Sequence, residues 1–230
     1  MQNIIIATIK EWNISNYFKL KDNNDSYKFH LITYKDELTV EYINELNPKY
    51  IFFPHWSWII PRNIYNNFDC IVFHMTDLPY GRGGSPFQNL IIREIYDTKI
   101  SALKVENGLD TGDIYLKEDF NISVGSAEEN FIKLSSIIFN KMIPEFLNKI
   151  LIPKKQSGDI VNFKRRTPEE SNMKLLKYKS INKIYDFIRM LDAEGYPKAF
   201  IETEFFKFEF TKANKIDNKI IEANVRIIKK

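Results

Sequence analysis

Short apolar runs alternate with amphipathic stretches over the first half of the chain. Residues 3–9 form a β-branched run that suits a strand buried on both faces. Further strand-like runs follow at 29–34, 50–53, 70–74 and 100–105. Residues 14–21 and 40–46 have helical character, and Thr39 is placed to cap the second helix. This alternation predicts a doubly wound, mostly parallel α/β sheet of Rossmann-like type, which binds ligands beyond the carboxyl ends of its strands.

The pattern changes in the second half. Residues 126–150 predict one long amphipathic helix, with Ser126 and Glu129 as its capping box. A polar connection begins at Pro153, and residues 201–228 suit a few short antiparallel strands. We therefore predict a domain with the Rossmann-like core over 1–152, and a region of linker, helix and short β-hairpin-like structure over 153–230.

Composition narrows the class of protein. The chain has 230 residues, of which 44% are hydrophobic and 27% charged, with a formal net charge of +3. The slight charge and scattered basic residues argue against a broad nucleic-acid surface. The single cysteine, Cys70, excludes an internal disulfide and a cysteine-based zinc site, and we expect no metal. No run reaches membrane-spanning length and no signal-peptide pattern is present, so we expect a cytoplasmic protein without a membrane partner.

Three polar features lie at or after the run at 70–74. They are His74 at its end, a Gly-Arg-Gly-Gly turn at 81–84, and Asp110 in a second turn. Each has an ordinary structural explanation when it is taken alone, since glycine turns reverse the chain and Asp before Thr-Gly is common turn chemistry. Their order and spacing are more specific.

The ordered set resembles the folate-dependent formyltransferases, whose signature is N-x-H-P-S-L-L-P-x-x-R-G, then Pro-x-Gln, then L-D-T-G. The matching residues are His74, Thr76, Pro79, Arg82, Gly83, Pro86, Gln88 and 109–112. The family asparagine is replaced by Val72. A second, weaker resemblance covers Arg166, Pro168, Glu169, Ile188, Arg189 and 196–200.

The resemblance implies transfer of a formyl group from N10-formyltetrahydrofolate, as cosubstrate, to an amine. Such transfer passes through a tetrahedral oxyanion and needs a positioned acid–base group. His74, oriented by Asp110, would fill that role. Val72 cannot donate a hydrogen bond from its side chain. Either another donor replaces the asparagine, with Thr76, Asn89 and Asn107 as candidates, or His74 and the backbone hold the oxyanion. A further alternative is that the chain is a catalytically silent relative.

Ligand contacts are expected on loops that follow strands. The family resemblance places folate against 54–61 and the turn before Asp110, and the alternative for 54–61 is a lid that packs on the core. The residues predicted to bind folate are Trp56, Trp58, Ile59, Ile60, Gly108 and Leu109. Those predicted to meet a nucleotide are Lys10, Trp12, Asn13 and Arg82. An ordinary helix start is the alternative for the first three, and loop bracing for Arg82.

The acceptor is predicted from the C-terminal segment. Only about thirty residues follow Pro197, too few for the five-stranded barrel expected of a transfer-RNA enzyme. The resemblance then favours bacterial nucleotide-sugar N-formyltransferases, which modify a dTDP-, GDP- or UDP-linked amino-dideoxy sugar for surface polysaccharide, including O-antigen. The alternative is another amine, including methionyl-tRNA. The aromatic residues Phe205, Phe206, Phe208 and Phe210 exceed what a small sheet can hide, and predict a homodimer.

Overall fold

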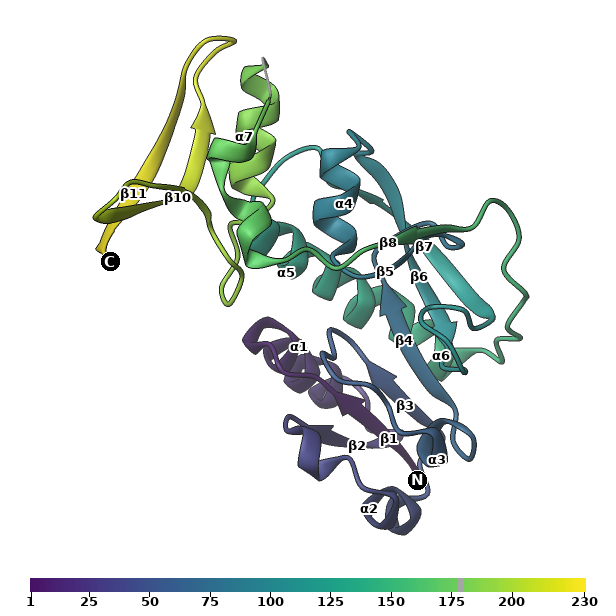
Figure 1. The fold of residues 1–230 in the computed structure, drawn as a ribbon. Helices are drawn as coiled ribbons and strands as arrows, with labels where there is room; N and C mark the ends of the chain where they lie inside the picture. The colour runs from purple at the N-terminus through teal and green to yellow at the C-terminus, as the bar shows by residue number, and fades with distance from the viewer. Residues whose placement is uncertain (178–179) are drawn as a thin grey trace. The chain divides into compact units, whose positions relative to one another are not determined.

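The computed structural model describes residues 1–177 and 180–230 and contains a six-stranded sheet of order β2-β1-β3-β4-β6-β7 (Figure 1). Strand β1 pairs in parallel with β2 and β3, β3 pairs in parallel with β4, and β4 pairs antiparallel with β6. The predicted mostly parallel α/β fold is therefore confirmed. The strands are β1 (Gln2–Ala7), β2 (Tyr27–Ile32), β3 (Tyr50–Phe53), β4 (Cys70–His74), β6 (Asp97–Lys104) and β7 (Ile114–Asn121).

Of the helices that follow the first three strands, the second α-helix starts where it was predicted, whereas the first starts at Glu11, three residues before the predicted residue 14. The helices are α1 (Glu11–Asp22), η1 (Lys35–Glu37), α2 (Val40–Leu46) and α3 (Arg62–Tyr65). The Thr39 hydroxyl accepts a hydrogen bond from the Tyr42 amide at 3.2 Å, so the predicted cap is confirmed. In β1, the side chains of Ile4, Ile5 and Ile6 are fully buried, as a strand covered on both faces requires.

The predicted long helix is interrupted. It consists of α5 (Ala127–Ile137), a π-helical turn η2 (Ile138–Met142) and α6 (Ile143–Asn148). Its capping box is present, with the Ser126 amide donating to Glu129 at 2.7 Å and the Glu129 amide to the Ser126 hydroxyl at 3.2 Å. Pro144 is the second residue of α6. Proline has no amide hydrogen to donate to the carbonyl of Asn140, so the π-helical turn lies where a regular helix would lose a hydrogen bond.

The chain forms two compact units, each assembled from separate segments. One comprises Met1–Arg82, Lys99–Phe120 and Ile132–Val161, and the other Gly83–Thr98, Asn121–Phe131 and Asn162–Lys230. The predicted boundary after residue 152 stays a prediction. No helix among residues 1–177 and 180–230 has the length and apolar character needed to cross a membrane.

The second unit contains a three-stranded antiparallel sheet of order β11-β10-β9 and helices α4 and α7. A separate two-stranded sheet pairs β5 with β8. The remaining elements are β5 (Tyr80–Gly83), α4 (Pro86–Ile92), β8 (Val161–Phe163), η3 (Pro168–Ser171), η4 (Met173–Leu175), α7 (Ile181–Arg189), β9 (Ala199–Glu202), β10 (Phe206–Lys215) and β11 (Ile221–Lys229).

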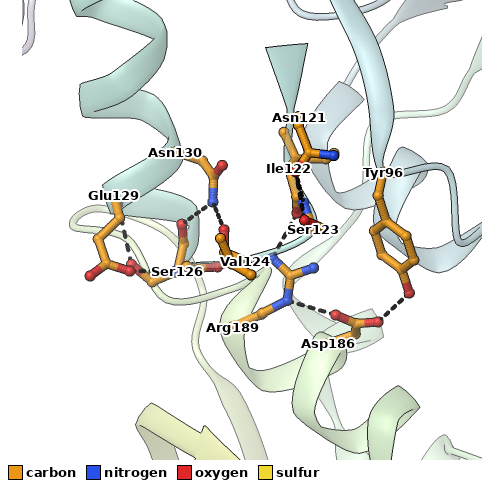
Figure 2. A network of polar contacts seen from close by, with 11 residues as sticks. Tyr96, Asn121, Ile122, Ser123, Val124, Ser126, Glu129, Asn130, Asp186 and Arg189 are labelled. Atoms are coloured by element: carbon orange, nitrogen blue, oxygen red, sulfur yellow. Dashed lines mark hydrogen bonds and ion pairs between the residues drawn. The ribbon is translucent and has the colours of Figure 1, made fainter.

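A buried arginine ties α7 to the turn after β7 (Figure 2). Arg189 is 2% exposed, forms an ion pair with Asp186 at 2.6 Å, and donates to the carbonyls of Ile122 at 3.0 Å and Gly125 at 2.9 Å. The Tyr96 hydroxyl donates to the same Asp186 at 2.7 Å. Burial, and then the bond to Asp186, raise the pKa of Tyr96 to about 12. The buried charge is thus paired with a carboxylate, while Nη2 of Arg189 has no hydrogen-bond partner among the described residues.

Candidate active site

His74 is the last residue of β4, at the carboxyl end of a strand inside the six-stranded sheet. It lies opposite Ser101 of β6 and is 8% exposed. Its Nε2 lies 2.7 Å from the carbonyl oxygen of Gly81. Because a carbonyl oxygen only accepts, Nε2 carries a hydrogen in this arrangement. The imidazole is therefore fixed on one side by the backbone of β5.

Asp110 faces the other side of the ring. Its Oδ2 lies 3.5 Å from Nδ1 of His74, and the two side chains are 14% and 10% exposed. Asp110 has a φ of 54°, and a Cβ on Gly112 would overlap the carbonyl oxygen of Lys104. The sharp turn between β6 and β7 thus requires glycine at position 112. It brings together two residues that are 36 positions apart.

Thr76 shares the acceptor that holds His74. Its hydroxyl donates to the Gly81 carbonyl at 3.4 Å, and its own carbonyl accepts from the Ser101 hydroxyl at 2.7 Å. The side chain is fully buried. Thr76 therefore helps to brace the residues around His74, and its hydroxyl already has an acceptor.

The two asparagines considered as oxyanion donors differ in their surroundings. Asn89 is 8% exposed, and its Nδ2 donates to the carbonyls of Gly84, Ser85 and Lys164 at 3.1, 3.0 and 3.0 Å. Because its amide hydrogens are directed to backbone carbonyls, we correct the expectation that Asn89 serves as an oxyanion donor. Asn107 is exposed, and its carbonyl accepts from the Thr111 hydroxyl at 3.1 Å.

The loop at 54–61 has a buried part and an exposed part. Trp56 contacts the rings of Phe53 and Trp58, with centroid separations of 5.9 and 4.8 Å. Its buried Nε1 has no hydrogen-bond partner among the described residues. Ile60 is 8% exposed, whereas Trp58 and Ile59 are 38% and 92% exposed. The loop therefore packs on the core through part of its length and presents apolar side chains through the rest.

The loop that carries Asp110 presents a similar surface. Leu109 is 69% exposed beside the aspartate, and Gly108 has a φ of 111°. Leu109, like Trp58 and Ile59, is thus an exposed apolar side chain close in sequence to a strand end in the first unit. All three were predicted to bind folate, and that role stays a prediction.

Of the residues after β1 that were predicted to meet a nucleotide, Asn13 has a structural role in the first unit. Asn13 is 2% exposed, and its Nδ2 donates to the Thr8 hydroxyl at 2.9 Å and to the Pro54 carbonyl at 3.2 Å. The expectation that Asn13 meets a nucleotide is therefore corrected, because its amide fixes the loop after β3. Lys10 and Trp12 lie together, with Nζ 5.5 Å from the ring centroid.

Sequence reasoning missed His55. Its ring lies edge-on to Trp12 at 6.1 Å, and its φ of 56° is unusual for a residue with a side chain. Burial, and then the charge of Lys10, lower its pKa to about 4. The only signal in the sequence was a histidine two residues after an apolar strand.

Arg82 braces a loop. Its Nε and Nη2 donate to Oε1 of Gln156 at 3.1 and 2.8 Å. Arg82 was expected either to bind a nucleotide or to brace a loop, and this arrangement corresponds to loop bracing. Gln156, another residue that sequence reasoning did not single out, lies in the polar connection after α6.

A solved structure described as methionyl-tRNA formyltransferase from Clostridium thermocellum is 55% identical to this chain, with a TM-score of 0.96, and the match covers 100% of both chains. This chain belongs to the formyltransferase family. A family model described as methionyl-tRNA formyltransferase, C-terminal domain, matches residues 168–228. Formyltransferases of this family use N10-formyltetrahydrofolate.

More distant relatives share parts of the sequence or the fold. Methionyl-tRNA formyltransferase of Rickettsia felis is 28% identical over 204 residues, which are 82% of this chain and 66% of that protein. The chain spans about half to two thirds of the curated relatives it matches. A 4-N formyltransferase from Francisella tularensis is 17% identical, with a TM-score of 0.70 over 88% of this chain and 93% of that one, and shows the shared fold.

The prediction of a nucleotide-sugar acceptor is wrong. The formyltransferase that is 55% identical to this chain is described as a methionyl-tRNA enzyme. The prediction rested on the small C-terminal β region, yet that relative matches over its whole length and the same region matches the C-terminal domain model. A short C-terminal segment therefore does not distinguish the two acceptor classes. The names of the similar enzymes point to a tRNA substrate, so they do not support the expectation of no nucleic-acid partner.

Proposed function

We propose that this formyltransferase moves the formyl group of N10-formyltetrahydrofolate to the amino group of methionyl-tRNA. The His74–Asp110 pair, 3.5 Å apart at the carboxyl end of β4, is the observation that carries the proposal. Imidazole accepts and returns a proton near neutral pH, and a carboxylate on one ring nitrogen stabilises the charged ring. The acceptor class rests on the relative that is 55% identical over both whole chains.

Transfer needs one bond formed, one broken and one proton moved. The amine nitrogen bonds to the formyl carbon, and the bond from that carbon to N10 of the folate then breaks. The proton lost by the attacking amine has to reach N10. His74 is suited to carry it, while Asp110 stabilises the imidazolium that forms in between.

The exposed apolar residues of two loops fit a flat ring system. Trp58, Ile59 and Leu109 each lose unfavourable contact with water when such a ring covers them. The buried Nε1 of Trp56, which has no partner among the described residues, is one donor that a ligand-induced shift of the loop would satisfy. These residues would bind the pterin of N10-formyltetrahydrofolate, which supplies the formyl group.

The C-terminal region has a larger excess of basic over acidic residues, relative to its length, than the whole chain, and this suits a nucleic-acid acceptor. Residues 203–230 carry seven lysine or arginine residues and four acidic residues. Cations in this segment can pair with phosphates, which supply most of the salt-dependent affinity for nucleic acids.

To test the proposal, the protein is incubated with N10-formyltetrahydrofolate and methionyl-tRNA. The amino acid is then released from the tRNA and its mass is measured by mass spectrometry. We expect methionine to gain one formyl group, and product formation to fall as salt rises. Uncharged tRNA and amino-sugar nucleotides serve as competing acceptors. No formylation of methionyl-tRNA, with tetrahydrofolate still bound, would contradict the proposal and favour a catalytically silent relative.

A further inference from the structure

Gln156 connects the two turns that supply the site. Its Oε1 accepts from Nε and Nη2 of Arg82 at 3.1 and 2.8 Å. Its Nε2 donates to the carbonyl oxygens of Asp110 and Gly112, each at 2.8 Å. One half-buried side chain thus joins β5, whose Gly81 carbonyl holds His74, to the turn that carries Asp110.

The orientation of the Gln156 amide follows from its partners. A guanidinium has only donors, so the oxygen of the amide has to face Arg82. The NH₂ group then faces the two carbonyls, each of which can only accept. The opposite orientation would set donor against donor and acceptor against acceptor, so the four contacts allow a single orientation.

The backbone around Gln156 is also attached to the first unit. Lys154 and Ile114 exchange two backbone hydrogen bonds of 2.8 and 2.9 Å, which fix the segment to the start of β7. Further along, the Val161 amide donates to the Pro79 carbonyl at 3.3 Å. The segment is therefore held on both sides of residue 156.

We propose that Gln156 is a positioning residue that sets the carboxylate of Asp110 against His74. Its bonds to the carbonyls of Asp110 and Gly112 fix the peptide unit that follows Asp110 and the one that follows Gly112. The Nδ1–Oδ2 distance of 3.5 Å leaves little room for drift before the contact is lost. Arg82 acts one step further away, because it holds the oxygen of Gln156. The kinetic consequence rests on the proposed function, but the positioning itself does not.

Gln156→Glu separates the two halves of this arrangement. The glutamate keeps an acceptor for Arg82, loses both donors, and places an oxygen against two carbonyl oxygens. Asn16→Asp is the matched control, since Asn16 is also half-buried and donates to the Ser135 hydroxyl at 2.8 Å in the same unit. Gln156→Met, which is uncharged and of similar length, is the second variant if the glutamate prevents folding.

The nuclear magnetic resonance signals of the His74 imidazole depend on the position of the Asp110 carboxylate, and they can be measured without any turnover. The chain has only three histidines, His30, His55 and His74, so each ring is assigned by its loss on substitution. We expect Gln156→Glu and Gln156→Met to move the His74 ring signals in the direction that Asp110→Asn moves them. The other two histidines, and all three in Asn16→Asp, should keep their signals. Unchanged His74 signals in a folded Gln156 variant would overturn the proposal.

Kinetics in the formyl-transfer assay give the second readout. We expect Gln156→Glu to lower kcat by about tenfold to a hundredfold, the range typical of misplaced catalytic groups, and to change KM for the formyl donor less than about threefold. In an Asp110→Asn background the same change should add little, since it acts through Asp110. If the losses in kcat from Gln156→Glu and Asp110→Asn multiplied in the double variant, the proposal would be contradicted. An inactive wild-type protein would reject the proposed function, and the imidazole signals would still decide the role of Gln156.

Discussion

Each ring nitrogen of His74 faces an oxygen of the protein. Nε2 lies 2.7 Å from the Gly81 carbonyl, and Nδ1 lies 3.5 Å from Asp110. A substrate proton therefore has to reach the ring in competition with one of these contacts. The contact to Asp110 is the longer of the two, and catalytic hydrogen bonds commonly shorten only when the substrate is bound.

Val72 fills the position of the family asparagine with an apolar side chain. It packs, partly buried, against a core cluster that includes Ile5 and Phe53. We predict that Val72→Asn lowers turnover, because an amide in this apolar setting is left without partners at a cost of about 1–3 kcal/mol. Steady-state kinetics and denaturant unfolding measure the two effects. A higher kcat with unchanged substrate binding would show instead that the site had only lost its oxyanion donor.

His55 gives stability a dependence on pH. Its pKa is lowered from 6.5 to about 4 in the folded state, so between these values the unfolded chain binds more protons. The free energy of unfolding should therefore decrease as pH falls from 6.5 to 4, by about 3 kcal/mol from this residue. His55→Asn, which tolerates a positive φ, should remove that part of the decrease. Above pH 7 the difference between wild type and variant should stay constant; a constant difference down to pH 4 would contradict the account.

The sequence predicted residues of the site unevenly. His74 and Asp110 were found because a family signature spans both, and the structure brings their side chains together. Asn13 and Asn89 were assigned to ligands, whereas their amides brace Pro54 and Lys164, which lie 41 and 75 positions away. Gln156 was not singled out, because its partner Arg82 is 74 positions away. Side-chain direction at these sites depends on contacts that no local pattern encodes.

Elements with local signals were predicted closely, and those that depend on distant partners were not. The helix Val40–Leu46 follows its Thr39 cap, and Tyr50–Phe53 and Cys70–His74 have the predicted bounds. The pair β5 and β8 was not predicted, since Tyr80–Gly83 contains two glycines and its partner Val161–Phe163 is three residues long. A strand this short forms only where the fold supplies its neighbour.

Helix α7 contributes residues to two ion pairs that differ in burial. Asp186 and Arg189 are 12% and 2% exposed in their side chains, whereas Lys183 and its partner Glu94 are 39% and 53% exposed. We predict that Asp186→Ala lowers the free energy of unfolding by about 3–5 kcal/mol, because it leaves the guanidinium buried without its carboxylate. Glu94→Ala is the control and should cost at most about 1 kcal/mol. Similar losses in the two variants, measured by denaturant unfolding, would contradict this assignment.

At the scale of the molecule, one face of the C-terminal sheet is apolar. Phe206, Phe208 and Phe210 alternate along β10, and Val225 and Ile227 pair with the last two. Val225 and Ile227 are 49% and 63% exposed. The sheet therefore gathers these phenylalanines on one face.

We predict a homodimer that covers this face. Light scattering should give about twice the chain mass of 27.3 kDa, and Ile227→Lys should shift the protein toward the monomer. Ile152→Lys, at another exposed isoleucine, is the control and should leave the mass unchanged. A monomeric wild-type protein at working concentration would count against the prediction.

The most direct test is the rate of formyl transfer from N10-formyltetrahydrofolate to methionyl-tRNA by the wild type, His74→Ala, Asp110→Ala and the double variant. We predict that each single substitution lowers the rate roughly a hundredfold or more while thermal unfolding shows an intact fold. The double variant should be little slower than the worse single one, because the two residues act as a unit. Near-normal transfer by either single variant would contradict the role of the His74–Asp110 pair.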